Sequence, residues 1–411
     1  MTKSRKKILF HLHAAPIPVS GGATRRLFGY LQYFRDRFDY LCVEAVSDRP
    51  FRSDEWNSEQ QRSLLEFVPK LHIYQHHALD YGYAKAKTGY YQKLLKQQIP
   101  VDCDYATPPD YVQFFQTLAH HQACDFILIN YLSFAHLAIA TKTPHTKTFI
   151  DIHDIACQNR LALKDTGFRK HLKFDYASNF AKEVQLLNQF DGVIINSQKE
   201  MDDLSTHLDF DQLRLIPHLV EDCQPTTRLM VYSHRTFMYD LLFVGSGHHT
   251  PNVEGINFFL ASIFPKIVDQ KPDVRLAIAG TVSQFIQVDD SLKANIECLG
   301  YVEDLSALYL QSKVFICPLL NGAGTKVKLQ EAMAYATPIV TTTVGASGLS
   351  LVDGINAIVT DQPDQFANQV LQLLSQPELA QKLSEAASMV FNDHYSNAAV
   401  YSKLDRLFGI G

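Results

Sequence analysis

Apolar and polar residues form two successive series of alternating strand and helix patterns along the chain. Short apolar runs predict buried strands, and apolar residues spaced about 3.6 apart predict helices. The first series predicts strands at 7–13, 40–46, 125–130, 148–152 and 192–196, and helices after 22, after 133 and within 174–188. The second predicts strands at 240–244, 275–279, 314–317 and 338–342, and a helix at about 253–269. Strands that alternate with helices indicate parallel sheets covered on both faces, which is the α/β class.

The chain is long enough for two such domains, because 411 residues exceed what one compact core usually holds. We expect a Rossmann-like domain over 1–220 and a second over 221–390, with a linker at 221–239 and an amphipathic helix at 396–408. Ligands of parallel sheets bind outside the carboxyl ends of the strands, so the expected site is a cleft between the two domains. Residues 52–121 give no clear pattern, and we expect them to carry elements that face an acceptor.

The composition is that of an ordinary globular protein and narrows the range of partners. With 46% hydrophobic and 20% charged residues and a formal net charge of −5, the chain lacks the basic character of a dedicated nucleic-acid binder. Its seven cysteines form no CxxC pair, which is typical of reduced thiols. Neither a signal peptide nor a membrane-spanning run is found, so we expect a cytoplasmic location. The basic run at 3–7 (KSRKK) has two open interpretations: a solubilised terminus, or weak attraction to the inner face of the membrane.

The clearest chemistry lies in the segment 319–338, LLNGAGTKVKLQEAMAYATP. A buried strand leads into a tight loop with Gly322 and Gly324, and a helix follows with Lys326 and Lys328 near its start. Exposed N–H groups and the helix dipole make such a start an anion site, and lysines there disfavour a helix unless an anion is bound. One turn further on, Glu331 is placed to accept hydrogen bonds from ribose hydroxyls. The alternative is an ion pair with Lys328, three positions earlier.

Motifs along the chain carry a resemblance to a known family. In the second half they are FVGSGHHTPN (243–252), LAIAG (276–280), LGYVEDLSALYLQSKVFICPL (299–319), GAGTKVKLQEAMA (322–334), TPIVTTTVGASGL (337–349) and DGINAIV (353–359). Their order and gaps resemble the retaining GT-B glycosyltransferases often called family 4, or glycosyl transferases group 1. The first half matches more loosely, through GGATRR (21–26), DIHD (151–154) and DGVIINSQKE (191–200). The resemblance implies two Rossmann-like domains that face each other across a cleft, with a C-terminal helix, here 391–411, that crosses back to the N-terminal domain.

By this resemblance, the second domain binds the nucleoside diphosphate of a sugar donor. The residues implied are Gly322, Ala323, Gly324 and Thr325 around the diphosphate, Lys326 and Lys328 as its counter-charges, Glu331 at the ribose, and the turn at Gly245 and Ser246. Two of them depart from the family pattern. Ala323 stands eight positions before Glu331, where the family often has a Glu that contacts the donor sugar. Because Ala323 replaces this Glu, the identity of the sugar cannot be carried over from the family. Ser246 stands where many members place an Arg, followed by a Lys, that clamp the phosphates.

In the first domain, each candidate has two open interpretations. Gly21 and Gly22 would let their loop approach the leaving phosphate or the acceptor, or they form a simple turn between strand and helix. His153 matches a family histidine that faces the donor sugar, or it is a polar residue satisfied within the fold. Arg25 and Arg26 contact acceptor or phosphate, or lie on a solvated helix face. The three His-His pairs, at 76–77, 120–121 and 248–249, lack metal-ligand spacing, so we expect no metal and no cofactor besides the donor.

The implied function is transfer of a hexosyl-type sugar, with retention of configuration, to a glycan or lipid-linked acceptor in cell-surface polysaccharide or glycoconjugate biosynthesis. The lysines and the helix start would stabilise the charge on the departing phosphate in place of Mg²⁺, and His153 would orient the sugar. Three alternatives stay open. They are another GT-B enzyme such as an epimerase or phosphorylase, an NAD(P) oxidoreductase whose Gly245-Ser246-Gly247 stretch lacks the third fingerprint glycine, and a non-catalytic scaffold in a glycan-assembly complex.

Overall fold

A computed structural model describes residues 3–19, 22–48, 56–74, 107, 109–162, 175–220, 232–322 and 324–410. The chain divides into two compact units. Unit 1 comprises Met1–His218 together with Tyr401–Gly411, and unit 2 comprises Leu219–Val400. The sequence had placed the corresponding boundaries at 220 and 390.

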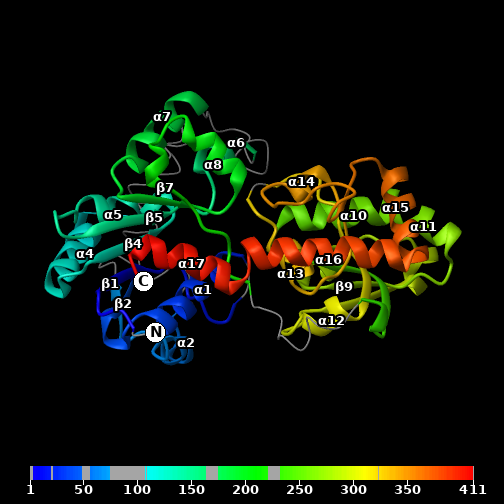
Figure 1. Cartoon of the computed structure of the whole chain (residues 1–411), viewed down its shortest axis with the longest axis horizontal. Coiled ribbons are helices and arrows are strands. Elements are labelled where there is room, and N and C mark those ends of the chain that lie inside the picture. Colours follow the sequence, from blue (N-terminus) through cyan, green and yellow to red (C-terminus); the bar gives the residue numbers. More distant parts are fainter. Residues whose placement is uncertain are drawn as a thin grey trace, which may run out of the picture. The chain divides into compact units, whose positions relative to one another are not determined.

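Unit 1 is built on a parallel sheet. Among the described residues, its strands follow the order β3-β2-β1-β4-β5-β6-β7. Figure 1 labels β1, β2, β4, β5 and β7 of this sheet. Their bounds are β1 Ile8–His11, β2 Val43–Asp48, β3 Lys70–Tyr74, β4 Phe126–Asn130, β5 Lys147–Asp151, β6 Gly192–Ile195 and β7 Leu213–Leu215. All described pairings are parallel, and β1 sits centrally, with Ile8 opposite Val43 on one side and Phe126 on the other.

Helices cover both faces of this sheet, because its central strands are apolar on both sides. On one face, Leu9 and Ile127 pack with Tyr111 and Phe115 of α4. On the other, Phe10 contacts Tyr30 and Phe34 of α1. The helices are α1 Gly22–Arg37, α2 Ser58–Leu64, α4 Pro109–Gln122, α5 Ala135–Ile139, α6 Ala156–Ala162, α7 Tyr176–Leu187 and α8 Gln198–Ser205.

Unit 2 repeats the design with a parallel sheet whose described strands follow the order β10-β9-β8-β11-β12-β13. Their bounds are β8 Tyr239–Val244, β9 Leu276–Ala279, β10 Ile296–Gly300, β11 Ser312–Cys317, β12 Ile339–Thr341 and β13 Ile358–Val359. The helices are α10 Thr250–Ser262, α11 Phe264–Gln270, α12 Ser306–Leu310, α13 Val327–Ala334, α14 Thr343–Ala346, α15 Pro363–Ser375 and α16 Pro377–His394.

The alternation of strand residues divides the core of unit 2 into two layers. Leu241 and Phe243 of β8 face a cluster that includes Phe259 of α10 and Phe366 of α15. Leu242, between them in sequence, faces the opposite cluster, which α13 and α16 supply. This is the pattern of a parallel sheet buried on both faces, and it confirms the α/β class expected from the sequence.

Several predicted element bounds are wrong for local reasons. Residues 40–42 form a 3-10 turn instead of opening β2, because Asp39 caps that turn. The helix expected at 253–269 breaks at Ile263 into α10 and α11, with Pro265 in the first turn of α11. Tyr239, assigned to the linker, already belongs to β8, while the linker residues 221–231 lie outside the described residues.

The chain ends in α17, Asn397–Phe408, whose last residues belong to unit 1. Phe408 is almost fully buried, in edge contact with Phe34, Phe126 and Phe149. The Asp405 carboxylate accepts hydrogen bonds from the Tyr33 hydroxyl at 3.0 Å and from Nε of Arg37 at 3.1 Å. A C-terminal helix therefore returns to the N-terminal domain, as the resemblance implied. No helix in the described part of the chain is long and apolar enough to span a membrane.

We predict that Phe408→Ala lowers the free energy of unfolding of unit 1 by about 3–5 kcal/mol, because it empties a closed aromatic cluster. Chemical denaturation of the full chain, followed by a probe in each unit, measures this. The matched control is Ser402→Ala, at an exposed position of the same helix, which should change stability by less than about 0.5 kcal/mol. Equal effects of the two substitutions would show that α17 does not stabilise unit 1.

Candidate functional site

The loop between β11 and α13 contains two glycines in backbone conformations that other residues rarely adopt. Gly322 has φ 123° and Gly324 has φ 69°. The buried strand β11 fixes where this loop begins, and α13 begins at Val327 directly after it. Lys326 occupies the N-cap position, but its side chain makes no capping hydrogen bond. The Lys326 side chain therefore does not satisfy the N–H groups at the positive dipole end of α13.

The Lys326 ammonium folds back over the loop, because it has no acceptor with which to cap the N–H groups of the helix. Its Nζ donates to the carbonyl oxygen of Gly324 at 2.7 Å and to that of Gly322 at 3.3 Å, and the side chain is buried. A cation thus holds the glycine loop in shape beside the start of α13. The helix end and the ammonium together concentrate positive charge there, which is the arrangement that an anionic ligand requires.

Lys328, in the first turn of α13, contacts residues of α10 and β8. Its Nζ donates to Oδ1 of Asn252 at 2.7 Å and lies 4.7 Å from the centre of the Phe243 ring. Burial lowers the pKa of Lys328, and the nearby Lys326 lowers it further against the opposing effects of Cys317 and Glu331. Two neighbouring ammonium groups repel each other. An anion bound near both of them would reduce this repulsion.

Asn252 connects this loop to the turn after β8. Its Nδ2 donates to the carbonyl oxygen of Ser246 at 3.1 Å, while its Oδ1 accepts from Lys328. The structure thereby brings the predicted turn at Gly245 and Ser246 together with the start of α13. Asn252 thus positions a lysine that comes from another element.

Glu331, on α13, has a partner that sequence reasoning missed. Its Oε2 accepts a hydrogen bond from the Tyr309 hydroxyl at 2.8 Å, and its side chain is 8% exposed. The ammonium of Lys328 is directed to Asn252 instead, so the i,i+3 ion pair is not what orients this carboxylate. Tyr309 lies in the apolar helix α12, and nothing in its sequence context marks it as a contact of the site.

The predicted residues of unit 2 that the structure describes therefore lie on two adjoining loops and one helix. They are Gly245, Ser246, Gly322, Gly324, Thr325, Lys326, Lys328 and Glu331. Ala323 and Gly21 lie outside the described residues. Gly22 and His153 belong to unit 1, where Gly22 is the exposed first residue of α1.

His153 follows β5 and is held deep in unit 1. It is 5% exposed, its ring stacks on Tyr131 with a centroid distance of 4.1 Å, and its Nε2 lies 3.1 Å from Oδ1 of Asn130. Its φ of 59° is unusual for a residue other than glycine. The ring of His153 has a hydrogen-bond partner, and its backbone is strained. Backbone strain of this kind often accompanies a functional site.

The buried position of Arg26 contradicts both interpretations that the sequence left open for this residue. Its side chain is 2% exposed and pairs with the fully buried Asp151 carboxylate, which also accepts from the Tyr30 hydroxyl at 2.7 Å. Although burial acts to lower the pKa of Arg26, the Asp151 carboxylate raises it above its usual value, so the guanidinium stays charged. Arg26 is a structural ion-pair residue, neither a phosphate ligand nor part of a solvated face.

Around this ion pair lies a group of four histidines, of which sequence reasoning identified one. They are His11, His13, His153 and His218. Burial lowers the pKa of each, to about 4 for His13. The signal in the sequence was the HLH ending of the first strand, because strand ends of a parallel sheet meet at one edge. All four rings are neutral at pH 7.

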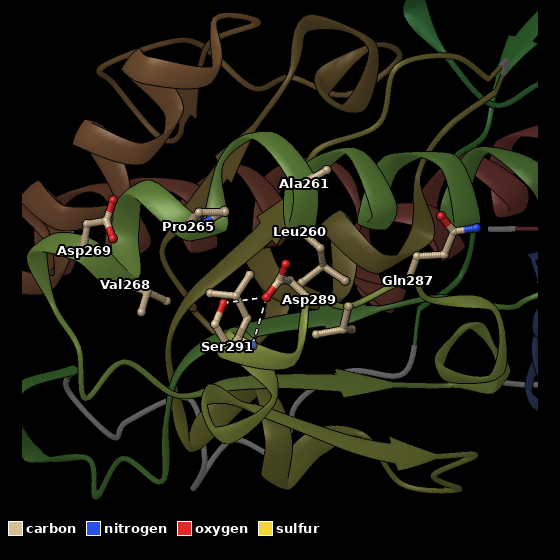
Figure 2. Close-up of a pocket in the computed structure, with 10 residues that line it drawn as sticks. Leu260, Ala261, Pro265, Val268, Asp269, Gln287, Asp289 and Ser291 are labelled. Carbon is tan, nitrogen blue, oxygen red and sulfur yellow. Dashed lines mark hydrogen bonds between the residues drawn. The ribbon is translucent and has the colours of Figure 1, made fainter.

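The groove drawn in Figure 2 is not suited to an anionic ligand such as a diphosphate. It has a volume of about 680 Å³, and Leu260, Pro265 and Val268 line one side of it. Its charged lining residues are Asp269 and Asp289, and Asp289 accepts hydrogen bonds from Ser291. An acidic lining repels a diphosphate, and no predicted site residue lines this groove. Among the described residues, moreover, no cluster of His, Cys, Asp or Glu has the geometry to hold a metal ion.

Comparison with known proteins shows which family the part of the chain that contains these loops resembles. Residues 239–376 match the family described as "Glycosyl transferases group 1". Unit 2 carries a glycosyl transferases group 1 domain. The match contains both loops of the site, from Gly245 to Glu331, so the loops that the structure brings together belong to this domain.

Curated relatives match parts of the chain. An "Uncharacterized 44.6 kDa protein in cps region" of Klebsiella pneumoniae is 25% identical over 40% of this chain and 45% of its own length. The D-inositol 3-phosphate glycosyltransferase of Corynebacterium diphtheriae is 25% identical over 55% of this chain and 58% of its own length. The chain thus spans about half the length of the curated relatives that it matches.

Solved structures match nearly the whole chain at low identity. HepE of Anabaena in complex with UDP has a TM-score of 0.67 at 14% identity, covering 98% of this chain and 99% of its own. A sucrose-phosphate synthase from Thermosynechococcus elongatus has a TM-score of 0.68 at 15% identity, covering 98% of both chains. This likeness shows the fold alone, and it confirms the GT-B class expected from the sequence.

The neutral histidines predict an acid-side loss of stability. The folded pKa of His13 is about 4 against the usual 6.5, so between these pH values the unfolded chain binds a proton that the folded chain does not. The free energy of unfolding therefore falls as pH falls through this window, by up to about 3 kcal/mol from His13. Urea unfolding at pH 7 and pH 4.5 should show a smaller drop for His13→Leu than for wild type. The control is the exposed His145→Leu, and an unchanged drop in His13→Leu would contradict the prediction.

Proposed function

We propose that the protein is a glycosyltransferase that moves a sugar from a nucleoside-diphosphate donor to a glycan or lipid-linked acceptor. The observation that carries the proposal is the start of α13, where a glycine loop, Lys326 and Lys328 concentrate positive charge. The glycosyl transferases group 1 domain, which contains this loop, supports the same conclusion. A diphosphate is the anion that two lysines and a helix start are suited to hold.

We also propose how the donor reacts. The bond between the sugar carbon and the β-phosphate oxygen breaks, the sugar passes to an acceptor hydroxyl, and the departing phosphate takes the hydroxyl proton. Negative charge grows on the phosphate, and each preorganised donor aimed at it contributes about 3–4 kcal/mol. Lys326, Lys328 and the α13 N–H groups supply such donors, so the reaction proceeds without a metal ion. Retention of configuration and a hexosyl donor follow the family resemblance.

The remaining assignments rest on resemblance and on the names of relatives. Glu331, oriented by Tyr309, receives the ribose, and His153 orients the donor sugar without taking the proton. A relative named for a cps region and solved structures such as WaaG, "a glycosyltransferase involved in lipopolysaccharide biosynthesis", favour a role in cell-surface polysaccharide or glycoconjugate assembly. We place the reaction in the cytoplasm, at or near the inner face of the membrane.

Thermal unfolding in the presence of EDTA tests the donor site. One of UDP, GDP, dTDP, CMP, ADP or NAD⁺, at 100-fold above its Kd, should stabilise the fold by about 2.7 kcal/mol. For a unit of this size, the melting temperature should rise by about 2–4 °C per kcal/mol. We expect a nucleoside diphosphate to give this shift and Lys326→Ala to lose it.

The matched control is Lys293→Ala, an exposed lysine of unit 2 paired only with Asp290 at the surface, which should keep the full shift. A shift with NAD⁺ alone would favour an oxidoreductase. No shift with any diphosphate would favour a non-catalytic scaffold. Either result would contradict the proposal.

A further inference from the structure

Two neighbouring strand ends of unit 1 hold His153 in a fixed orientation. Nδ2 of Asn196 donates to the His153 carbonyl oxygen at 2.6 Å, and the His153 N–H donates to Oδ1 of Asp151 at 3.3 Å. Both His153 and Tyr131, which stacks on it, have positive φ values, 59° and 68°. Non-glycine residues keep such conformations only where the surroundings determine them. The backbone of His153 is therefore held from both sides.

The Asn130 side chain has one orientation that satisfies its neighbours. It is fully buried at the end of β4, and its Nδ2 donates to the His11 carbonyl oxygen at 2.7 Å. A carbonyl oxygen only accepts hydrogen bonds, so the amide nitrogen must face His11 and the amide oxygen must face the His153 ring. The atom 3.1 Å from Nε2 of His153 is thus an acceptor.

This fixes the position of the ring proton. Because Oδ1 of Asn130 accepts, Nε2 of His153 must carry the hydrogen, and in a neutral ring Nδ1 then carries a lone pair. Within the described residues, Nδ1 makes no hydrogen bond of its own. The ring of Tyr131 stacks on the imidazole at 4.1 Å, and the ring of His13 lies edge-on to it at 5.4 Å.

The charged surroundings keep this ring neutral. Burial lowers the pKa of His153 well below its usual value, and the positive charge of Arg26 and the neighbouring His13 lower it further. The titratable and charged groups packed around the ring are His13 after β1, Arg26 on α1, Tyr131 after β4, Asp151 at the end of β5 and His218 after β7. Asp151 is already paired with Arg26.

We propose that Asn130 is a positioning residue that fixes His153 as the Nε2–H tautomer, so that Nδ1 serves as a hydrogen-bond acceptor for a hydroxyl group of the transferred sugar. This inference rests on the proposed function and deepens it, because it states which atom of His153 meets the sugar. A neutral acceptor in a buried cluster is a weak base. His153 therefore selects and orients a hydroxyl without removing its proton.

The tautomer is measured directly on the wild-type chain, without any ligand. Long-range nitrogen–proton correlation spectra of the full chain, labelled with ¹⁵N-histidine, distinguish the two neutral forms, and the absence of one signal set in His153→Gln assigns His153. We expect an unprotonated Nδ1 and a protonated Nε2 at pH 7. A protonated Nδ1, or a doubly protonated ring, would overturn the proposal whatever the protein's activity.

The pH profile tests the role of Asn130 in the reaction. Asn130→Asp places a carboxylate against Nε2–H, which favours the imidazolium and raises the pKa of His153. Release of nucleoside diphosphate from the donor should then lose about tenfold in kcat/KM for each pH unit below that raised pKa, because protonated Nδ1 no longer accepts. The wild type should show no such fall between pH 8 and 6, and an Asn130→Asp profile identical to wild type would overturn the proposal.

Two further variants separate positioning from general loss of structure. Asn130→Leu should lower kcat by about 10–100-fold, as is typical when the partner that orients a histidine is removed. Asn179→Ala removes another buried asparagine of unit 1, whose amide donates to the carbonyl oxygen of Asp175 at the N-cap of α7, and should keep wild-type rates and pH profile. If wild type turns over no nucleotide sugar while the spectra show the Nε2–H form, the proposed function fails and the tautomer assignment stands.

Discussion

Positive charge at the start of α13 is the constraint that the site in unit 2 is organised around. Lysines at this end of a helix oppose the dipole, and the structure holds each one with neutral oxygens: Lys326 with loop carbonyls and Lys328 with Asn252. These contacts hold both ammonium groups in place. The two glycine conformations, the turn after β8 and the Tyr309–Glu331 hydrogen bond lie on the same loops and helix as these lysines.

Unit 1 presents a different kind of edge at the carboxyl ends of its strands. At this edge the charge pair between Arg26 and Asp151 is buried. The histidines around that pair are neutral, so they offer hydrogen-bond donors and acceptors but little charge. Such an edge is suited to hydroxyl groups, whereas the edge of unit 2 is suited to phosphates. The two units of the chain thus differ in chemistry although they share one type of sheet.

Much of the fold and part of the site followed from the sequence. Strands buried on both faces, such as Phe126–Asn130, have an unmistakable apolar pattern, and a loop with Gly322, Gly324 and two lysines indicates an anion site. The short strands β7 and β13 and the half-exposed edge strand β10 were missed because they bury too little to show a pattern. The partners Asn252, Tyr309 and Asn130 were missed for another reason: each acts through a contact distant in sequence, which only the fold creates. For Arg26 the sequence was misleading in the opposite way. A charged residue in a helix is usually solvated, and only the fold shows that Arg26 is buried against Asp151.

The most direct test of the central claim is turnover of nucleotide sugars without metal. The full chain would be incubated in EDTA with a panel of UDP-, GDP- and dTDP-sugars, and released nucleoside diphosphate would be measured for wild type, Lys328→Gln and Lys293→Gln. The account predicts release from one donor class by wild type and Lys293→Gln, with a loss of at least about 100-fold in Lys328→Gln. Release that requires Mg²⁺, or that is equal in all three proteins, would contradict it.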